Sequence, residues 1–189
     1  MAIKVYIDQG HNPTGFANTG ASWYGQNEQD VTYEVGLRLA ELLRADGRFE
    51  VRLSRPAADT VLGSSNSSSL RERVRQANSW GANYFLSIHA NASLNTEANG
   101  TEIYVYRLYS QADWLAQQVL RGIVDAVGTR DNGVRPRPGL YVLKNTDMPA
   151  ILVELAYLSN SGDAQKLRRD REAFARGIYQ GMLRYFGFA

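Results

Sequence analysis

Strand-like and helix-like segments alternate along the whole chain, and this order constrains the fold more than any other feature. Apolar residues alternate in IKVYID, which predicts a strand, and recur at helical spacing in residues 26–47, where Gly47 is the predicted helix end. Further strands are predicted in residues 49–55, 83–89, 100–108, 140–144 and 150–156, and further helices in residues 69–82, 111–127 and 163–185. This order predicts one α/β domain with a largely parallel, mixed sheet of about six strands and helices on both faces. Between these elements, GSSNSSS at residues 63–69 is interpreted as a flexible loop, and the Pro/Gly/Arg-rich segment TRDNGVRPRPG as another loop.

Length and composition fit a single globular domain. The chain has 189 residues, 44% of them hydrophobic, so we expect residues 1–189 to form one domain with its own core. The net charge of +2 gives no reason to expect a nucleic-acid partner, and no run reaches the roughly 18 apolar residues of a membrane helix. Disulfides and thiolate ligands are excluded because the chain has no cysteine. The chain begins directly with a strand-like segment, so we expect no signal peptide in it.

The chain has only two histidines, and each is associated with the end of a predicted strand. His11 follows the first strand in YIDQGHN, and His89 ends the strand in FLSIH. The carboxyl ends of parallel strands meet at one edge of a sheet, where ligands bind in folds of this class. A lone histidine is more often a satisfied core residue than a ligand. Two scattered core histidines, however, would have no reason to share that edge.

Two carboxylates are predicted at the same edge. Glu154 ends the apolar strand AILVE, where an unpaired charge would be costly without a task. Glu28 lies in the first turn of the first helix, where favouring the helix dipole is a sufficient explanation by itself. The loop before that helix returns from the first strand, so Glu28 can close on His11. Two histidines and a carboxylate with an open fourth position form the ligand set of hydrolytic zinc sites, and Glu154 is the remaining candidate for the general base. The residues therefore predict a zinc-dependent hydrolase.

Seven segments also resemble, in order and spacing, the zinc-dependent N-acetylmuramoyl-L-alanine amidases of the amidase-3 type. These are IDQGHN, NEQDV, LRERVRQAN, FLSIHANAS, NGTEIYVY, LYVLKNTDMPAILVELAYLSN and FARGIYQGMLRYF, and they cover nearly the whole chain. The resemblance implies hydrolysis of the amide between the lactyl group of N-acetylmuramic acid and the L-alanine of the peptidoglycan stem peptide. It places the family's zinc ligands on His11, Glu28 and His89 and its catalytic glutamate on Glu154. The usual DPGHGG is DQGHNP here and NRGV is DNGV, which affects loop shape and substrate fit but no ligand.

Two other functions stay open at this point. A zinc peptidase acting within the stem peptide is not separated from an amidase without the resemblance. A non-catalytic peptidoglycan-binding module would be expected to lack the base or a ligand, whereas all four residues are present.

We expect a monomer that needs Zn²⁺ and acts on peptidoglycan or muropeptides. Its expected location is outside the cytoplasm, in the cell wall or periplasm, or it is a phage lysin. A host autolysin, a spore enzyme and a phage lysin are all compatible with these residues.

Residues around the predicted site allow several interpretations. Asp8 and Asn91 could orient the imidazoles, although ordinary turn capping is the favoured explanation for both. Possible substrate contacts, each with packing or solvation as an equal alternative, are Phe16, Trp23, Tyr24, Arg130, Arg135 and Arg137. Glu102 belongs to a family-like motif but is not predicted to be a ligand.

Some members of the family have an extra helix that covers the zinc until an activator displaces it. Too few residues separate the strand 100–108 from the helix at 111 for such a helix, so no activator protein is expected.

Overall fold

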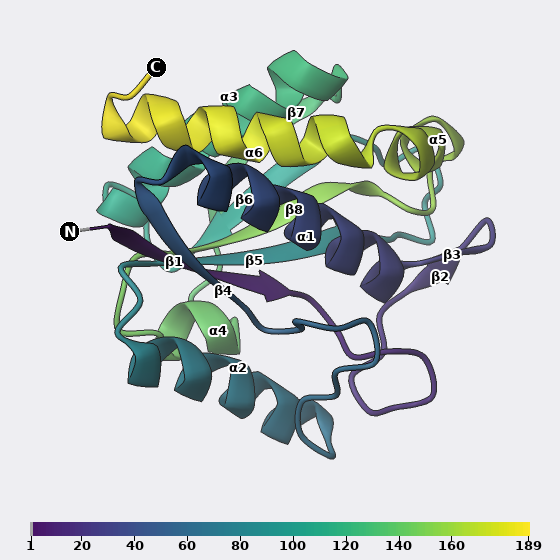
Figure 1. The fold of residues 1–189 in the computed structure, drawn as a ribbon. Coiled ribbons are helices and arrows are strands. Elements are labelled where there is room, and N and C mark those ends of the chain that lie inside the picture. Colours follow the sequence, from purple (N-terminus) through teal and green to yellow (C-terminus); the bar gives the residue numbers. More distant parts are fainter. Residues whose placement is uncertain (1) are drawn as a thin grey trace.

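A six-stranded sheet lies at the centre of the molecule in the computed structural model, which describes residues 2–189 (Figure 1). In spatial order its strands are β4 (Phe49–Leu53), β1 (Ile3–Gln9), β5 (Tyr84–Asn91), β8 (Ala150–Tyr157), β6 (Thr101–Val105) and β7 (Asp131–Pro136). Every pair is parallel except β6 with β8. A separate hairpin consists of β2 (Ser22–Trp23) and β3 (Gln26–Asn27). The predicted mixed sheet of about six strands is confirmed, while Met1 of the predicted domain lies outside the described residues.

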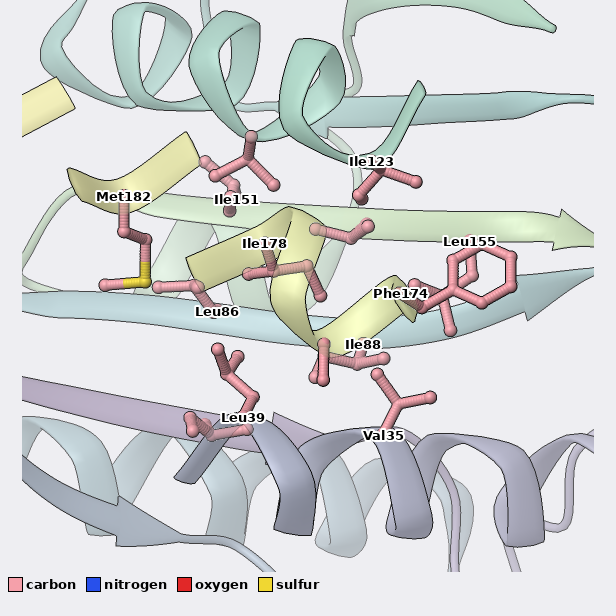
Figure 2. Close-up of a cluster of buried hydrophobic side chains, with 14 of the residues drawn as sticks. Val35, Leu39, Leu86, Ile88, Ile123, Ile151, Leu155, Phe174, Ile178 and Met182 are labelled. Atoms are coloured by element: carbon pink, nitrogen blue, oxygen red, sulfur yellow. The ribbon is translucent and has the colours of Figure 1, made fainter. Parts of the chain in front are cut away.

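Helices cover both faces of the sheet, as predicted (Figure 1). One face carries α1 (Glu28–Asp46), α3 (Gln111–Val127) and α6 (Arg171–Phe186), and the other carries α2 (Asn66–Trp80) and α4 (Tyr141–Asn145). A further helix, α5 (Ser161–Arg169), follows β8 and precedes α6. The larger hydrophobic core lies between the first group of helices and the sheet, where Leu39, Ile88 and Ile178 are fully buried (Figure 2). Among residues 2–189, no helix is long and apolar enough to cross a membrane.

Helices α3 and α6 approach each other closely because glycines line their contact. A Cβ atom on Gly177 would lie 2.7 Å from Cα of Ile123 and 2.8 Å from the carbonyl oxygen of Gly122. A Cβ atom on Gly181 would likewise lie 2.5 Å from the backbone of α3. These backbone atoms cannot move aside as a flexible side chain would. The absence of side chains at these positions therefore sets the distance between the two helices.

Two predictions in the segment between α3 and β8 are wrong. Residues 140–144 were expected to form a strand, but they contribute to the short helix α4. Val142 and Leu143 of this helix are buried in a smaller hydrophobic cluster together with Val74 of α2 and Phe85 of β5. The edge strand is instead β7, within the segment predicted to be a loop. A short run of four apolar residues does not distinguish a buried strand from a short helix. An edge strand also tolerates Pro136, because its outer side needs no ladder hydrogen bonds.

Several element boundaries also differ from the prediction. The serine-rich segment is not simply a loop, because α2 begins at Asn66 and Ser65 caps it: Ser68 N donates to Ser65 Oγ, and Ser65 N donates to Ser68 Oγ at 2.8 Å. Serine is poor inside a helix but favourable at its start. The predicted final helix is divided into α5 and α6 at Asp170, whose backbone leaves the helical region. Strand β6 ends at Val105 rather than at residue 108.

Candidate metal centre

Three side chains from three separate elements meet at one edge of the sheet. His11 follows β1, Glu28 is the first residue of α1, and His89 lies in β5. Glu28 Oε2 lies 3.1 Å from Nε2 of His11, and Glu28 Oε1 lies 3.0 Å from Nδ1 of His89. One ligand atom from each of the three residues lies within 4.8 Å of the others. The predicted set of two imidazoles and one carboxylate is therefore present as a cluster.

The carboxylate of Glu28 is held in place by the backbone. Its Oε2 accepts a hydrogen bond from Ala21 N at 3.0 Å, and its Oε1 accepts one from Ala90 N at 3.1 Å. Burial alone would raise the pKa of Glu28, but hydrogen bonds from His11 and His89 outweigh it, and the pKa is lowered below the usual range. Glu28 is therefore ionised at neutral pH, as a ligand to a cation must be.

The backbone around the cluster leaves room for the ligands. A Cβ atom on Gly10 would lie 2.5 Å from Cε1 of His89, and one on Gly20 would lie 2.7 Å from Oε2 of Glu28. Only glycine fits at these two positions with the imidazole and carboxylate where they are. Two imidazole nitrogens and one ionised carboxylate oxygen form a donor set that suits zinc. The residues present therefore fit such an ion.

The hydrogen-bond partner of His11 is a backbone oxygen and not one of the two side chains considered in the sequence. Nδ1 of His11 lies 3.2 Å from the carbonyl oxygen of Asn18, a contact that directs its Nε2 toward Glu28. Asp8 instead binds Arg73 and Ser87, and Asn91 donates to Glu102 at 2.8 Å. Neither residue therefore hydrogen-bonds an imidazole, so the less favoured alternative, that they orient the histidines, finds no support in these contacts. The contact with Asn18 was not predictable because it involves a backbone oxygen in an irregular loop.

Glu154 lies beside this cluster in the middle of the sheet. In the register of the strands it is paired with His89 of β5 on one side and with Glu102 of β6 on the other. Its Oε2 is buried and has no hydrogen-bond partner among residues 2–189. Burial raises the pKa of Glu154 well above its usual value, and the negative charges of Glu28 and Glu102 raise it further. An unpartnered carboxyl group of this kind, next to a ligand set, is suited to accept a proton.

Glu102 is a second buried carboxylate at the site whose surroundings the sequence did not predict. It is 3% exposed and accepts hydrogen bonds from Asn91 Nδ2 and, at 2.9 Å, from the Tyr157 hydroxyl. Nη1 of Arg135 lies 3.6 Å from its Oε2, and the Arg137 guanidinium lies over the Tyr104 ring. Two of the predicted arginines are therefore on the side of the site formed by β6 and β7. Cross-strand register between distant segments determines these contacts, and a single sequence does not display that register.

The other predicted substrate contacts are distributed more widely. Arg130 is exposed, and Trp23 packs against the larger hydrophobic core, which agrees with its interpretation as a packing residue. Phe16 and Tyr24 are exposed in the same long loop. Next to the two histidines lies a cavity of about 140 Å³, and most of its remaining lining is apolar. Leu70, Leu140, Val142 and Leu152 are among its lining residues.

The α/β fold carries a possible metal site at the edge of its sheet, and comparison with known proteins identifies the family. A family model described as N-acetylmuramoyl-L-alanine amidase matches residues 5–184. The amidase LytC of Bacillus subtilis is 37% identical over 96% of this chain, and the amidase CwlM of Bacillus licheniformis is 36% identical over 99%. The chain belongs to the N-acetylmuramoyl-L-alanine amidase family. It spans 35% of the length of LytC and 70% of the length of CwlM.

Solved structures show the same fold. The catalytic domain of the amidase CwlV from Bacillus (Paenibacillus) polymyxa is 32% identical, with a TM-score of 0.86 and 99% of both chains covered. The amidase CwlD from Clostridioides difficile, solved in complex with the GerS lipoprotein, is 25% identical, with a TM-score of 0.89, and the match covers 99% of this chain and all of that one. Similarity along the entire chain supports the predicted fold class and the predicted family.

Proposed function

We propose that this chain is a zinc-dependent amidase that cleaves the bond between the lactyl group of N-acetylmuramic acid and the L-alanine of the stem peptide. The observation that carries the proposal is the His11–Glu28–His89 cluster, with the unpartnered carboxyl oxygen of Glu154 beside it. Membership of the amidase family supports the choice of substrate.

Each of the four residues has a distinct role in this proposal. His11, Glu28 and His89 hold the zinc ion, and the backbone donors Ala21 and Ala90 fix the carboxylate of Glu28. Zinc bound there supplies a Lewis acid that polarises the scissile carbonyl and lowers the pKa of water to about 7. Glu154 takes the proton of the attacking water and then delivers it to the departing amine of L-alanine. A raised pKa suits both steps, because the same carboxyl group must first accept and then donate.

The proposal also states where the chain acts and whether it needs a partner protein. The chain acts on cell-wall material outside the cytoplasm, in agreement with relatives that include a cell wall amidase of Bacillus anthracis and an endolysin of Bacillus phage SPP1. It needs no activator protein and works as a monomer. Among residues 2–189, no helix is inserted between the end of β6 at Val105 and the start of α3 at Gln111.

The test is digestion of defined muropeptides with purified chain and zinc, followed by mass spectrometry of the products. We expect a new amino terminus on L-alanine, formed without any added protein, and no product after removal of zinc by chelation. A new terminus within the stem peptide would identify a peptidase, and binding without cleavage would identify a binding module. Activity that appears only with a partner protein would contradict the activator-free part of the proposal.

A further inference from the structure

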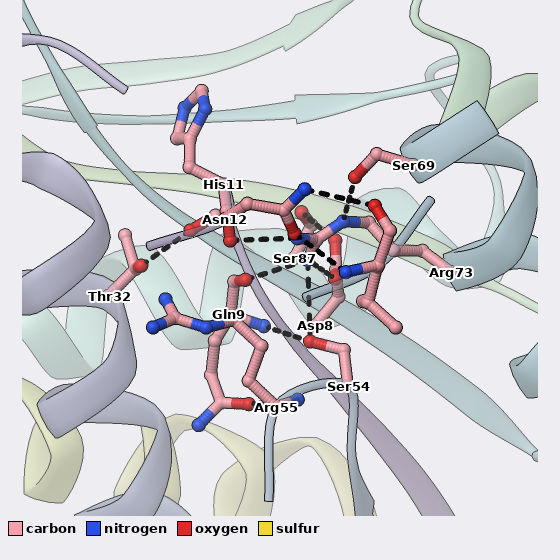
Figure 3. A network of polar contacts seen from close by, with 12 residues as sticks. Asp8, Gln9, His11, Asn12, Thr32, Ser54, Arg55, Ser69, Arg73 and Ser87 are labelled. Carbon is pink, nitrogen blue, oxygen red and sulfur yellow. Dashed lines mark hydrogen bonds and ion pairs between the residues drawn. The ribbon is translucent and has the colours of Figure 1, made fainter. Parts of the chain in front are cut away.

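Three consecutive carbonyl groups, beginning at the last residue of β1, are bound by side chains (Figure 3). The carbonyl oxygen of Gln9 accepts from Arg73 Nη1 at 2.7 Å, that of Gly10 from Thr32 Oγ1 at 2.7 Å, and that of His11 from Arg73 Nη2 at 2.8 Å. This is the segment that carries His11 to the candidate metal centre. Two of the three contacts come from a single residue of α2, a helix that contributes no predicted ligand.

The backbone of His11 needs such support because of its conformation. Its φ angle is 70°, in the left-handed region that residues with a side chain seldom adopt. In Figure 3 the imidazole of His11 points away from the polar network, while its carbonyl group is bound within it. A relaxed backbone at this position would redirect the imidazole. The contact from Arg73 Nη2 to the His11 carbonyl therefore acts on the orientation of the ligand.

Arg73 is itself fixed in position. It is 1% exposed, and its Nη1 also donates to Asp8 Oδ1 at 2.5 Å. Asp8 is equally buried, and its other oxygen accepts from the Ser87 hydroxyl at 2.7 Å. The guanidinium is thus held by β1 and, through Asp8, by β5. It has little freedom to release the loop that it binds.

We infer that Arg73 is a positioning residue, whose guanidinium holds the left-handed backbone of His11 so that the imidazole faces Glu28 and His89. This inference rests on the proposed zinc centre. It assigns to α2 a part in forming that centre. Arg73 touches neither the ion nor the substrate in this assignment, and it acts only through the backbone of His11.

The substitution Arg73→Lys tests the contact between Arg73 Nη2 and the His11 carbonyl. An ammonium group can keep the ion pair with Asp8, but it lacks the second, separately directed nitrogen that reaches the His11 carbonyl. Arg55→Lys is the matched control, because Arg55 is also 1% exposed and its guanidinium binds the carbonyls of Gln29 and Ala58 instead. Both variants replace a buried guanidinium, so both are expected to lower the melting temperature of the metal-free protein.

The experiment measures zinc affinity by competition with a chelator, together with amide hydrogen exchange of the metal-free proteins. Arg73→Lys should bind zinc about 10- to 100-fold more weakly, the usual effect of losing a group that orients a ligand. It should also exchange the Asn12 amide faster, because that amide donates to the Asn18 carbonyl at 3.0 Å in the same loop. Arg55→Lys should leave zinc affinity and exchange at Asn12 unchanged.

Unchanged zinc affinity in Arg73→Lys, or an equal loss in both variants, would overturn the inference. If Arg73→Lys does not fold, the double variant Asp8→Asn with Arg73→Met removes both charges together, and its zinc affinity gives the answer instead. Weakened binding in that variant supports the inference, and wild-type affinity overturns it. A wild-type chain that binds no zinc would instead contradict the proposed function, so the two failures are distinguishable.

Discussion

Glu154 and Glu102 are direct partners in the antiparallel register of β8 and β6, but only Glu102 has its carboxylate satisfied by hydrogen bonds. The two acids therefore have different roles although they are neighbours. Asn91 and Tyr157 stabilise the charge of Glu102, and that charge in turn raises the pKa of Glu154. The carboxylate of Glu102 is held by hydrogen bonds, whereas Oε2 of Glu154 has no hydrogen-bond partner among residues 2–189.

The first prediction follows from this pair. Glu102→Gln removes a negative charge beside Glu154, so the pKa of Glu154 should fall. A base is active when it is deprotonated, so the acid limb of the pH profile of kcat/KM should move to lower pH. Profiles of wild type and variant on the same muropeptide would measure the shift. Movement of the acid limb to higher pH would contradict this relationship between the two acids.

The proposed metal ligands give the second prediction. With only two histidines in the chain, His11→Ala or His89→Ala should each abolish tight zinc binding, and Glu28→Gln should weaken it. Zinc per chain after dialysis is the measurement, and circular dichroism checks that the variants are folded. A full complement of zinc in either histidine variant would refute the ligand assignment.

The third prediction separates the base from the ligands. Glu154→Gln should retain zinc and fold normally but lose activity by about 10²–10⁴-fold, the usual contribution of a general base. Its retained zinc also provides the control for the ligand variants. A near-wild-type rate, or loss of the metal, would show that the role of Glu154 has been misassigned.

The buried ion pair between Asp8 and Arg73 gives the fourth prediction, which concerns stability. Burial tends to raise the pKa of Asp8, but Arg73 and the hydrogen bonds of Asp8 outweigh it, so the net pKa in the folded protein is lowered. A lowered folded pKa means stability that is present above the unfolded pKa of about 3.9 and is lost as the pH falls through the folded value. Asp8→Asn should cost about 3–5 kcal/mol at pH 7, because it leaves Arg73 buried and unpaired.

Urea denaturation across pH measures this effect. The difference in unfolding free energy between wild type and Asp8→Asn should be constant from pH 7 down to about the unfolded pKa, and it should shrink at lower pH as the wild-type carboxyl becomes protonated. A difference that grows as the pH falls would contradict the prediction.

The fifth prediction tests the contact between α3 and α6. Gly177→Ala places a methyl group against the backbone of Ile123 and Gly122, and overpacking of this kind typically costs about 1–3 kcal/mol. Gly139→Ala is the control, because a Cβ atom there meets no atom within 4 Å. Thermal unfolding of both variants is the measurement. Equal melting temperatures would show that the helices separate at little cost.

The sequence predicted the helices and strands whose apolar residues recur at a regular spacing. It also predicted which residues lie together at the carboxyl ends of the parallel strands. Gly47 ends helix α1 as predicted. His11 and His89 meet at one edge because His11 follows β1 and His89 lies near the end of β5, the neighbouring parallel strand. The short apolar run of α4 was misassigned because five residues contain too little periodicity to identify a helix. The contacts of Arg73 were not predicted for another reason. Arg73 donates to backbone carbonyl oxygens, and the sequence does not show where these oxygens lie in the folded loop.

The distribution of His11, Glu28 and His89 over three elements has a consequence for the proposed zinc centre. Residue 89 is the last of the three in the chain, and the pairing of β1 with β5 brings its strand beside the one that His11 follows. In the proposed function, tight zinc binding therefore requires the assembled sheet. Zinc at 100 times its Kd would then add about 2.7 kcal/mol to the stability of the folded domain.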